Sequence, residues 1–570
     1  MIRKIGLKFG SAPSEDNLKI DITPITIFVG PNNSGKSKIL KEINQFCSSG
    51  QNEQSNVIIE EIILHKINES LGEKILKHIV IESKENETLP EGYVSIGEKF
   101  HNKVMLKSKL NESFERPNER DFLRLFCDLF LSFNTLYLNG EGRMHLTKEK
   151  NGGNLQSPPT NSLSTLFRDD EKRSKVRRII YDAFKMYFVI DPTDLGKFKV
   201  KLSDITPKSD LEERGIHSEA IEFHKKAKSI EQLSDGVKAF TGIILEIIAG
   251  EPLVLLIDEP EAFLHPSLSF KLGKEVAISA SEQKKNVFVS THSSHFLMGC
   301  IQSGVPVNIV RLTYSRNIAT ARLLSSGNIL TLMRNPLMRS TGVINGLFYE
   351  AVVVTESDAD RAFYQEINDR LLRFSPDMGI ANCLFINAQN KQTVHQIIKP
   401  LRDIGIPAVA VVDIDILKEG GKVWTNFVSS ANIPDILSKS LGTMRQEIKK
   451  KFTELNLDMK RGGGVTCLPS EEEEVANTIF DQLNNYGLFV VRNGELESWL
   501  TELNATGHGP KWLIETFEKM GENPESAKYL KPKDDDVWQF LAAINAWVTN
   551  KNKKGILNQR IEEMPAVNNI

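Results

Sequence analysis

The chain has 570 residues, too many for a single hydrophobic core, and this length predicts about two to four domains. Hydrophobic residues make up 40% and charged residues 25% of the sequence, the balance of an ordinary soluble globular protein, which excludes a fibrous or disordered chain. The formal net charge of −3 argues against a generally basic coat for nucleic acid, although it is compatible with a local basic channel.

The cysteines and the apolar runs bear on where the protein works. The five cysteines are scattered without a CxxC pair, so neither a zinc site nor a disulfide framework is expected. The first residues, MIRKIGLKFG, are partly basic but have no apolar segment behind them. No later run reaches the roughly 18–20 apolar residues of a membrane span. We therefore expect a cytoplasmic protein that makes no membrane contact.

The first part of the chain, residues 1–335, has the pattern of one α/β domain. Strand-like runs lie at 25–29, 252–258 and 286–290, and a long middle with mixed helical patterning separates the first two. Within that middle we expect an inserted helical region at about 150–230, which begins with a turn-rich stretch. The basic run KRSKVRR at 172–178 favours a solvated helix face over a DNA contact.

After residue 340, short apolar runs alternate with helix-like segments, which predicts βαβ units and a parallel sheet. The expected strands are 351–355, 383–387, 408–412 and 487–491. The stretch 440–480 is charged and reads as a loop, and the end of the chain has a polar, helical pattern. We expect one domain at 345–505 and a helical region at 506–570.

The sequence GPNNSGKS fits the phosphate-binding pattern G-x-x-x-x-G-K-[ST] between an apolar strand and an amphipathic helix. Its backbone N–H groups would close around the phosphates of ATP, Lys36 would reach the β and γ phosphates, and Ser37 would ligate Mg²⁺. A fortuitous glycine turn is the alternative. The other predicted cofactor-binding residues of this loop are Gly30, Asn32, Asn33, Ser34 and Gly35.

Three later motifs follow in an order that supports nucleotide binding. LSDG places Ser234 and Gly236 at the start of an apolar helix, where a hydroxyl and the helix N-terminus can meet an anion. An apolar strand then ends in Asp258, expected to hold the metal, and Glu259, expected to orient or deprotonate the attacking water. A further strand ends near His292, which would touch the γ-phosphate.

This series resembles an ABC-type ATPase head of the SMC and Rad50 class. The matching segments are Walker A at 30–37, the LSxG signature at 233–236, Walker B at 254–259, the D-loop region at 261–266 and the switch histidine. In that family the signature of one subunit caps the ATP held by another, so the resemblance implies a homodimer or higher oligomer, with the insertion contributing to it. For the segment around the Q-loop glutamine, the sequence offers one candidate, residues 137–143.

Acidic residues follow three of the expected strands in the second half. Glu356 follows the first, Asp413 and Asp415 the third, and Glu495 and Glu497 the fourth. Because ligands of a parallel sheet lie beyond the carboxyl ends of its strands, these side chains are expected to converge on Mg²⁺ or Mn²⁺. Two such ions could activate water and stabilise the leaving oxygen of a phosphodiester.

Each acidic residue could instead have a structural role, because carboxylates also cap helices and carry first-turn charges. Asp358 and Asp360 suit that role best by position, since both directly follow the strand end. Three converging clusters nevertheless favour the metal interpretation over the structural one.

Residues 351–415 resemble a TOPRIM domain, in which a Glu follows the first strand and a DxD follows the third. The usual glycine after that Glu is replaced by Ser357, and 387–391 resembles the segment after the second strand, where a glycine is commoner than Asn390. Asp360 and the GELE stretch match further acidic positions of the OLD (overcoming lysogenization defect) family, which joins an N-terminal ABC ATPase to a C-terminal TOPRIM nuclease. The resemblance implies that these residues bind metal and that the fold is an ABC-type P-loop ATPase with a helical insertion, then a parallel α/β TOPRIM domain with a helical tail.

OLD nucleases also use a lysine near the C-terminal end to steady the transition state. Lys511 is the candidate that the resemblance suggests, and Lys528, Lys531 or Lys533 could serve instead.

The leading interpretation is an ATP-binding, metal-dependent DNA endonuclease or nickase. In the OLD family such proteins often act in anti-phage defence, in Gabija-type systems and as retron effectors, which implies a partner such as a helicase or a reverse transcriptase with its nucleic acid. An ATP-driven DNA clamp or sensor, whose carboxylates bind metal only for structure, is the alternative. Topoisomerase chemistry is weaker, since none of the nine tyrosines lies in a recognisable context.

Overall fold

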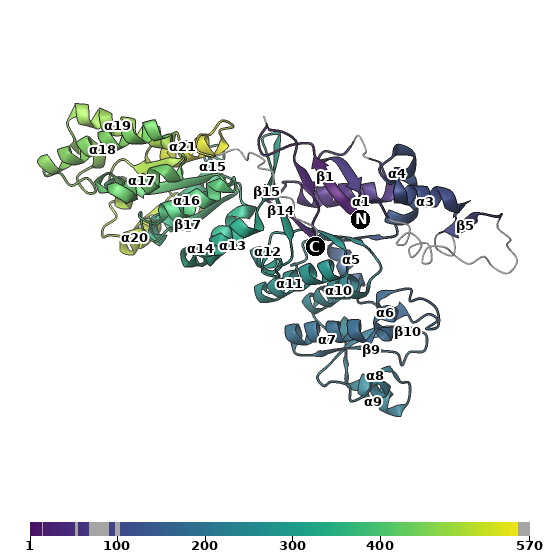
Figure 1. Ribbon diagram of the computed structural model, residues 1–570. Coiled ribbons are helices and arrows are strands. Elements are labelled where there is room, and N and C mark those ends of the chain that lie inside the picture. Colours follow the sequence, from purple (N-terminus) through teal and green to yellow (C-terminus); the bar gives the residue numbers. More distant parts are fainter. Residues whose placement is uncertain (14, 52–54, 68–89, 97–102, 557–570) are drawn as a thin grey trace. The chain divides into compact units, whose positions relative to one another are not determined.

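The computed structural model describes residues 1–13, 15–51, 55–67, 90–96 and 103–556 (Figure 1). The chain divides into two compact units, and each is described by itself. The first comprises Met1–Val29 and Asn33–Leu330, and the second comprises Thr331–Ile570 together with the short segment Gly30–Asn32. Within the described ranges, no helix has both the length and the apolar character needed to cross a membrane.

The first unit is built on a six-stranded sheet of order β15-β14-β3-β13-β12-β7. Its strands are β3 (Ile25–Val29), β7 (Thr135–Leu138), β12 (Val254–Asp258), β13 (Asn286–Ser290), β14 (Val307–Ser315) and β15 (Ile318–Leu324). All neighbours pair in parallel except β14 and β15. The three strands expected from the sequence are confirmed, and their apolar runs are buried as central parallel strands require.

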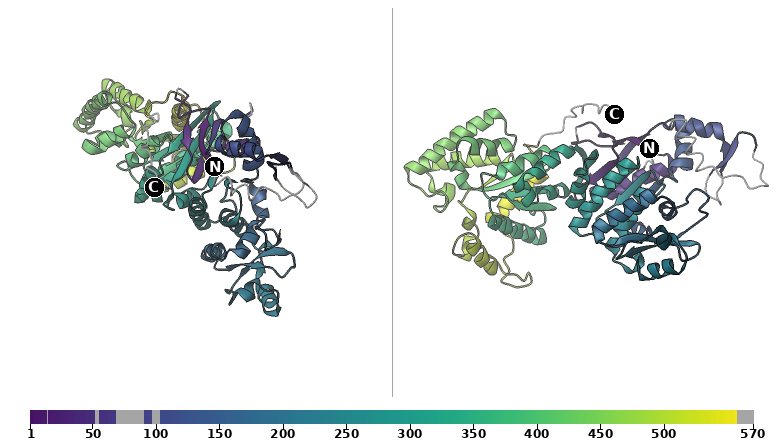
Figure 2. Two further views of the ribbon diagram at one scale, coloured as in Figure 1. Left: turned by 45° about the vertical axis from the view of Figure 1, so that its right-hand side comes forward. Right: turned by 60° about the horizontal axis from the view of Figure 1, so that its bottom comes forward.

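Helices and a smaller sheet pack around this central sheet. The helices that carry or support the predicted motifs are α1 (Lys36–Ser49), α5 (Gly140–His145), α10 (Asp235–Ala249), α11 (Pro266–Glu282) and α12 (Ser294–Ile301). In Figures 1 and 2, α11 and α12 lie side by side. The smaller sheet consists of β2 (Lys19–Asp21), β1 (Ile2–Leu7) and β4 (Ile59–Leu64). A buried cluster that includes Ile5, Ile39 and Phe130 joins the two sheets.

The remaining elements of this part are short. They are the hairpin β5 (Tyr93–Ile96) and β6 (Lys103–Leu106), the helices α3 (Lys107–Glu115) and α4 (Arg120–Phe126), and the π-helix η1 (Cys127–Leu131).

The insertion expected to be helical contains strands as well. Four strands form it with helices α6 to α9: β8 (Lys150–Asn151), β9 (Tyr187–Asp191), β10 (Lys197–Ser203), β11 (Lys228–Ser229), α6 (Ser162–Arg168), α7 (Asp170–Phe184), α8 (Asp210–Arg214) and α9 (Ser218–Lys226). The helical expectation overlooked the strand signal of β10, in which buried Phe198, Val200 and Leu202 recur with period two between lysines. The basic run lies in α7, where buried Arg173 pairs with Glu213, which favours a structural role for that residue.

The second unit has a four-stranded sheet of order β17-β16-β18-β19 in which every pair is parallel. Its strands are β16 (Ala351–Thr355), β17 (Cys383–Asn387), β18 (Ala408–Asp413) and β19 (Leu488–Val491). All four strands expected from the sequence are therefore present. Helices α15 (Asp358–Phe374) and α16 (Val394–Asp403) connect them, and α13 (Ser326–Arg334), α14 (Pro336–Ser340) and the 3-10 helix η3 (Val343–Phe348) precede the sheet.

The stretch 440–480 is mostly helical, so the loop expected there is wrong. Helices α18 (Asp435–Glu454) and α19 (Ser470–Asn484) occupy most of this part and lie side by side (Figures 1 and 2). Helix α17 (Gly421–Ser430) precedes them. Buried Leu441, Ile448 and Phe452 form the inner face of α18 at helical spacing. The many charges lie on the outer faces of these helices and hid that spacing in the sequence.

The end of the described chain carries α20 (Pro510–Met520) and α21 (Asp536–Thr549), as the expected helical region implied. Residues 557–570 of that region lie outside the described ranges. Short 3-10 helices complete the chain: η2 (Ile230–Gln232), η4 (Ile414–Lys418), η5 (Gly464–Cys467), η6 (Leu496–Ser498) and η7 (Thr501–Leu503).

Candidate functional site

The phosphate-binding loop lies between β3 and α1, as its sequence pattern requires. Gly30, Asn33 and Gly35 have φ angles of 146°, 60° and 96°, a backbone that glycine and asparagine adopt most readily. Gly35 is the N-cap residue of α1 and has no side chain to occupy the first amide groups of the helix. A helix N-terminus left open in this way is an anion site.

Lys36 and its neighbours provide the charge and the metal ligands of this loop. Lys36 is 5% exposed, and burial lowers its pKa to about 8 although Glu259 and Asp258 oppose that shift. Its Nζ lies 3.5 Å from Ser34 Oγ. Ser37 Oγ donates a hydrogen bond of 2.9 Å to Asp258 Oδ1 at the end of β12. The two residues predicted to share the metal of the nucleotide are therefore in contact.

Glu259 and His292 lie together beyond the ends of β12 and β13. His292 Nε2 is 3.9 Å from Glu259 Oε1, and the His292 amide donates to Glu261 Oε1 at 2.7 Å. Burial and the charge of Lys36 lower the pKa of His292 to about 4, so the imidazole is neutral at pH 7. The geometry thus brings both residues predicted for hydrolysis to the same edge of the sheet.

Arg143 is a residue of this site that the sequence did not indicate. It is 2% exposed, and its guanidinium donates to the backbone carbonyl of Glu259. It lies on α5 directly after β7, within the segment 137–143 that was a candidate for the Q-loop region. A lone arginine in a loop-like stretch carries no signal of such a long-range contact.

The signature residues lie at the start of α10. Ser234 is the exposed N-cap residue of this helix, and its side chain makes no capping hydrogen bond. A Cβ atom on Gly236 would lie 2.6 Å from the carbonyl oxygen of Phe263, so only glycine fits beside the 261–266 segment. The role of these residues in capping a nucleotide held by another subunit stays a prediction.

In the second unit, three acidic residues converge at the carboxyl ends of neighbouring strands. Glu356 directly follows β16, Asp413 ends β18 and Asp415 lies in η4. Thr355 of β16 stands opposite Val411 of β18 in parallel register, which brings both strand ends to one place. One ligand atom from each acidic residue lies within 4.8 Å of the others. We call Glu356, Asp413 and Asp415 the strand-end carboxylate group.

The electrostatics of this group favour a cation. Burial, followed by the neighbouring carboxylates, raises the pKa of Glu356 above its ordinary value, and burial does the same for Asp413 against the opposing charge of Lys460. The Asp413 amide donates to Glu356 Oε1 at 2.9 Å. Asp415 Oδ1 is buried without a hydrogen-bond partner. Hard, partly unsatisfied oxygens of this kind fit Mg²⁺ or Mn²⁺.

Two lysines lie among these carboxylates. Lys460 Nζ is 2.8 Å from Asp413 Oδ2 and 3.6 Å from Asp415 Oδ2, and Lys391 Nζ is 2.6 Å from Asp415 Oδ2. Both ammonium groups supply positive charge where a metal ion would also supply it. Sequence reasoning missed Lys460 because it lies in a glycine-rich connection between α18 and η5, far along the chain from either strand.

Asp360 forms a capping box with the residue that replaces the usual TOPRIM glycine. The Ser357 amide donates to Asp360 Oδ2 at 2.8 Å, and the Asp360 amide donates to Ser357 Oγ at 3.2 Å. Asp358 pairs with Arg361 at 2.7 Å, a first-turn contact. Asp360 thus has the structural role that the sequence left open, and its role as a metal ligand stays a prediction.

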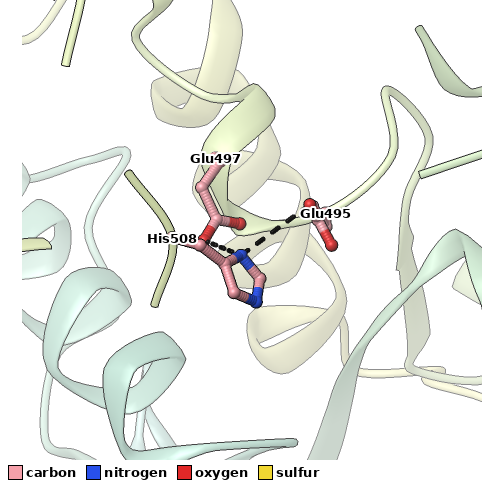
Figure 3. Close-up of side chains that lie close together, drawn as sticks. All are labelled: Glu495, Glu497 and His508. Atoms are coloured by element: carbon pink, nitrogen blue, oxygen red, sulfur yellow. Dashed lines mark ion pairs between the residues drawn. The ribbon is translucent and has the colours of Figure 1, made fainter. Parts of the chain in front are cut away.

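Glu495 and Glu497 were expected to converge with the strand-end carboxylate group. They form a second group with His508 (Figure 3). The ligand atoms of these three residues also lie within 4.8 Å of one another. Lys460 connects the two groups, since its Nζ is 3.3 Å from Glu495 Oε2. We call Glu495, Glu497 and His508 the histidine–carboxylate group.

The lysines suggested by the resemblance lie at the surface. Lys511 is exposed in the first turn of α20, two residues after Gly509, whose amide donates to Glu497 Oε1 at 2.6 Å. Lys533 pairs with Glu502, Lys531 lies over the ring of Phe374, and Lys528 is exposed. The described lysines in direct contact with the strand-end carboxylate group are therefore Lys391 and Lys460, and a catalytic role for Lys511 stays a prediction.

Two protein-family models match the chain, in the order ATPase then TOPRIM. Residues 25–298 match the model described as "AAA domain, putative AbiEii toxin, Type IV TA system", and residues 347–415 match "Overcoming lysogenization defect protein-like, TOPRIM domain". A search of curated proteins finds no match.

Solved structures similar to the chain include three SMC heads. An SMC head bound to the C-winged helix domain of ScpA is 16% identical and covers 58% of this chain and 99% of its own, with a TM-score of 0.32. The head from Thermotoga maritima is 14% identical, with coverage of 57% and 99% and a TM-score of 0.28. The head from Pyrococcus furiosus, with an extended coiled coil, is 13% identical, with coverage of 58% and 98% and a TM-score of 0.30.

An AAA-type ATPase domain that contains the phosphate-binding loop is thus followed by an OLD-like TOPRIM domain that contains the strand-end carboxylate group. The chain thus carries an ATPase domain and a metal-dependent nuclease domain in the order that supports an ATPase–TOPRIM fusion of the OLD (overcoming lysogenization defect) type.

Proposed function

We propose that the protein is an ATP-binding and ATP-hydrolysing DNA endonuclease or nickase that uses Mg²⁺ or Mn²⁺. The observation that carries this proposal is the convergence of Glu356, Asp413 and Asp415 within 4.8 Å at the ends of two neighbouring strands. Such a set of buried, mutually repelling carboxylates is stable when a cation lies between them.

The residues of the carboxylate site have separable tasks in this proposal. Bound divalent ions would supply a water of lowered pKa and stabilise the leaving oxygen of the phosphodiester. Glu356 and Asp413 would hold an ion between two strand ends, and the unsatisfied Oδ1 of Asp415 would complete its protein ligands. Lys460 balances the carboxylate charge until the metal and the phosphate of the substrate arrive.

The ATPase unit would control that centre. Lys36 and Ser37 would bind the phosphates and metal of ATP, while Glu259 and neutral His292 would position the attacking water. Ser234 of a second copy would cap the nucleotide, because its hydroxyl is exposed and does not cap its own helix. ATP binding or hydrolysis would then set the geometry of a homodimer or higher oligomer and so govern access of DNA to the carboxylates.

The decisive test is plasmid cleavage by the purified chain with Mg²⁺ or Mn²⁺. Glu356→Gln removes one ligand charge and is expected to lower cleavage at least about a hundredfold while ATP hydrolysis continues. Glu447→Gln, an exposed carboxylate of α18, is the matched control and should cleave like wild type. Intact plasmid under all metal conditions, with no effect of Glu356→Gln in cells, would contradict the nuclease function.

The family resemblance further supports a role as an anti-phage defence effector, with a helicase or a reverse transcriptase as partner. Phage plating on cells that express the chain tests this role. Plating should fall with wild type and recover with Glu356→Gln; equal plating with both variants and with an empty vector would rule the defence role out.

One observation favours the alternative of an ATP-driven DNA clamp or sensor. Lys391 and Lys460 already pair with Asp415 and Asp413, so the carboxylates have a charge-balanced state without metal. The clamp predicts ATP hydrolysis that is stimulated by DNA, abolished by Lys36→Ala and never accompanied by strand cleavage. Cleavage that depends on Glu356 excludes it.

A further inference from the structure

Arg143 is a buried cation beside the residues expected to hydrolyse ATP. Its side chain is 2% exposed, and its guanidinium donates a hydrogen bond to the backbone carbonyl of Glu259. Burial lowers the pKa of Arg143, and the carboxylates of Glu261, Glu259 and Asp258 oppose that shift. A buried guanidinium costs free energy unless it has such partners, so Arg143 belongs to the charged end of β12.

The backbone of Glu259 has a conformation that a glutamate rarely adopts. Its φ angle is 51°, in the left-handed region where a side chain crowds the backbone. The Glu259 amide donates to the Ser290 carbonyl oxygen at 2.9 Å, and the Glu259 carbonyl accepts from the Ala262 amide at 3.0 Å as well as from Arg143. Strain of this kind persists where the surroundings fix it, and Arg143 supplies the side-chain part of that restraint.

The side chain of Glu259 depends on this backbone for its position. The side chain is 53% exposed, and its Oε1 lies 3.9 Å from His292 Nε2. That distance is too long for a hydrogen bond, so the contact with His292 does not by itself fix the carboxylate. The direction of the carboxylate is therefore set by the backbone angles that Arg143 helps to hold.

Helix α5 in turn holds Arg143. Asn139 caps this helix, since its side-chain oxygen accepts from the Gly142 amide at 2.8 Å. A Cβ atom on Gly242 of α10 would lie 2.7 Å from Leu146 Cβ and 3.3 Å from the Arg143 carbonyl oxygen. Glycine thus lets α5 pack directly on α10, and this packing places the backbone from which Arg143 reaches Glu259.

We propose that Arg143 is a positioning residue for ATP hydrolysis, whose guanidinium holds the Glu259 backbone and so keeps the Glu259 carboxylate beside His292. There Glu259 would orient or deprotonate the water whose oxygen bonds to the γ-phosphorus while the bond to the ADP oxygen breaks, giving ADP and phosphate. This inference deepens the proposed function and rests on it, because Glu259 has a reaction to serve only if the chain hydrolyses ATP.

Two competing explanations make different predictions. An arginine that only stabilises the fold predicts lower stability of its variants without a selective loss of kcat. An arginine that touches the phosphates of ATP predicts a weaker affinity for the nucleotide when it is replaced.

The test compares ATP hydrolysis and nucleotide binding by the full-length chain with Mg²⁺. Arg143→Gln should lower kcat at least about tenfold, because a small displacement of a reacting group is enough for such a loss. KM for ATP, and the dissociation constant of a non-hydrolysable ATP analogue, should stay within about twofold of wild type. Arg143→Lys, which can still donate to a carbonyl, should recover part of kcat. His145→Gln, at an exposed position of the same helix, should hydrolyse ATP like wild type.

A double-mutant cycle under single-turnover conditions shows whether Arg143 acts through Glu259. Adding Arg143→Gln to Glu259→Gln should slow hydrolysis no further, whereas two independent effects would multiply. Gly242→Ala keeps the inference testable if Arg143→Gln does not fold. Its Cβ would push α5 away from α10, so kcat should fall while the analogue binds as in wild type.

Wild-type kcat in Arg143→Gln or in Gly242→Ala would overturn the inference, as would multiplied effects in the double variant or weaker binding of the analogue by Arg143→Gln. Plasmid cleavage by wild type, measured in parallel, separates these outcomes from the proposed function. If wild type hydrolyses ATP and cleaves plasmid while Arg143→Gln hydrolyses ATP normally, this inference alone fails. If wild type hydrolyses no ATP, the ATPase part of the proposed function fails and the inference falls with it.

Discussion

Lys36 is a buried ammonium group, and its burial gives nucleotide binding a pH dependence. Burial lowers its pKa to about 8, so the free site loses its charge as the pH rises through that value. The phosphates of ATP favour the charged form, so the complex keeps the proton. We expect ATP affinity to be flat between pH 6.5 and about 7.5 and to fall by up to about tenfold per pH unit above about 8. Calorimetric titration across this range measures it.

Lys36→Arg is the matched control for that pH dependence. A guanidinium stays charged throughout the range, so the affinity of this variant, although weaker, should not fall above pH 8. An equal fall in both proteins would assign the titration to another group and contradict the role of Lys36.

Lys460 contacts both acidic groups, and its removal separates charge balance from metal binding. Lys460→Met keeps the length of the side chain but leaves Asp413 and Glu495 without their shared ammonium. We expect the metal-free protein to lose about 1–3 kcal/mol of stability and to gain more from added Mg²⁺ than wild type does. Thermal unfolding with and without Mg²⁺ measures both effects.

Lys422→Met, at an exposed position of α17, is the control for that comparison and should behave as wild type. If Lys460→Met shows the same gain from Mg²⁺ as wild type, the ammonium and the metal do not compete for these carboxylates. That result would place Lys460 outside the metal centre.

At the scale of elements, the capping box of α15 determines how Glu356 is presented. Ser357→Ala removes one side-chain acceptor and is expected to cost about 1 kcal/mol, whereas Ser357→Gly, the usual TOPRIM residue, should cost only a few tenths. Chemical denaturation of the full chain measures the difference. Asp360→Asn keeps an acceptor for the Ser357 amide, so weaker Mg²⁺ binding in this variant at unchanged stability would establish Asp360 as a ligand as well as a cap.

The elements that the sequence predicted are those whose pattern is local. Parallel strands such as β16 and β18 are short apolar runs that end in carboxylates, and the phosphate-binding loop has fixed spacing. Helices α18 and α19 were missed because their buried faces are narrow and their exposed faces highly charged. His508, Lys460 and Arg143 were missed because each lies in a loop or a short helix. In such a segment no periodic pattern of apolar residues predicts which way a side chain points.

At the scale of the whole molecule, the proposed capping of ATP by a second copy of the chain can be tested at the start of α10. The exposed hydroxyl of Ser234 would contact a nucleotide only if that nucleotide were bound by a second copy of the chain. Glu259→Gln should slow hydrolysis and hold ATP, because it leaves the binding residues Lys36 and Ser37 in place. We expect this variant to dimerise with ATP and Mg²⁺ and to remain monomeric with ADP, as measured by sedimentation velocity.

Adding Ser234→Arg to Glu259→Gln should abolish the ATP-dependent dimer, because the larger side chain blocks the approach of a nucleotide to the start of α10. The monomer should stay folded, since Ser234 is exposed and its side chain does not cap the helix. Ser48→Arg, an exposed serine at the end of α1, should leave the dimer unchanged. A dimer that persists in the Ser234 variant, or that forms equally without nucleotide, would assign self-association to another surface and remove the signature from the control of the nuclease.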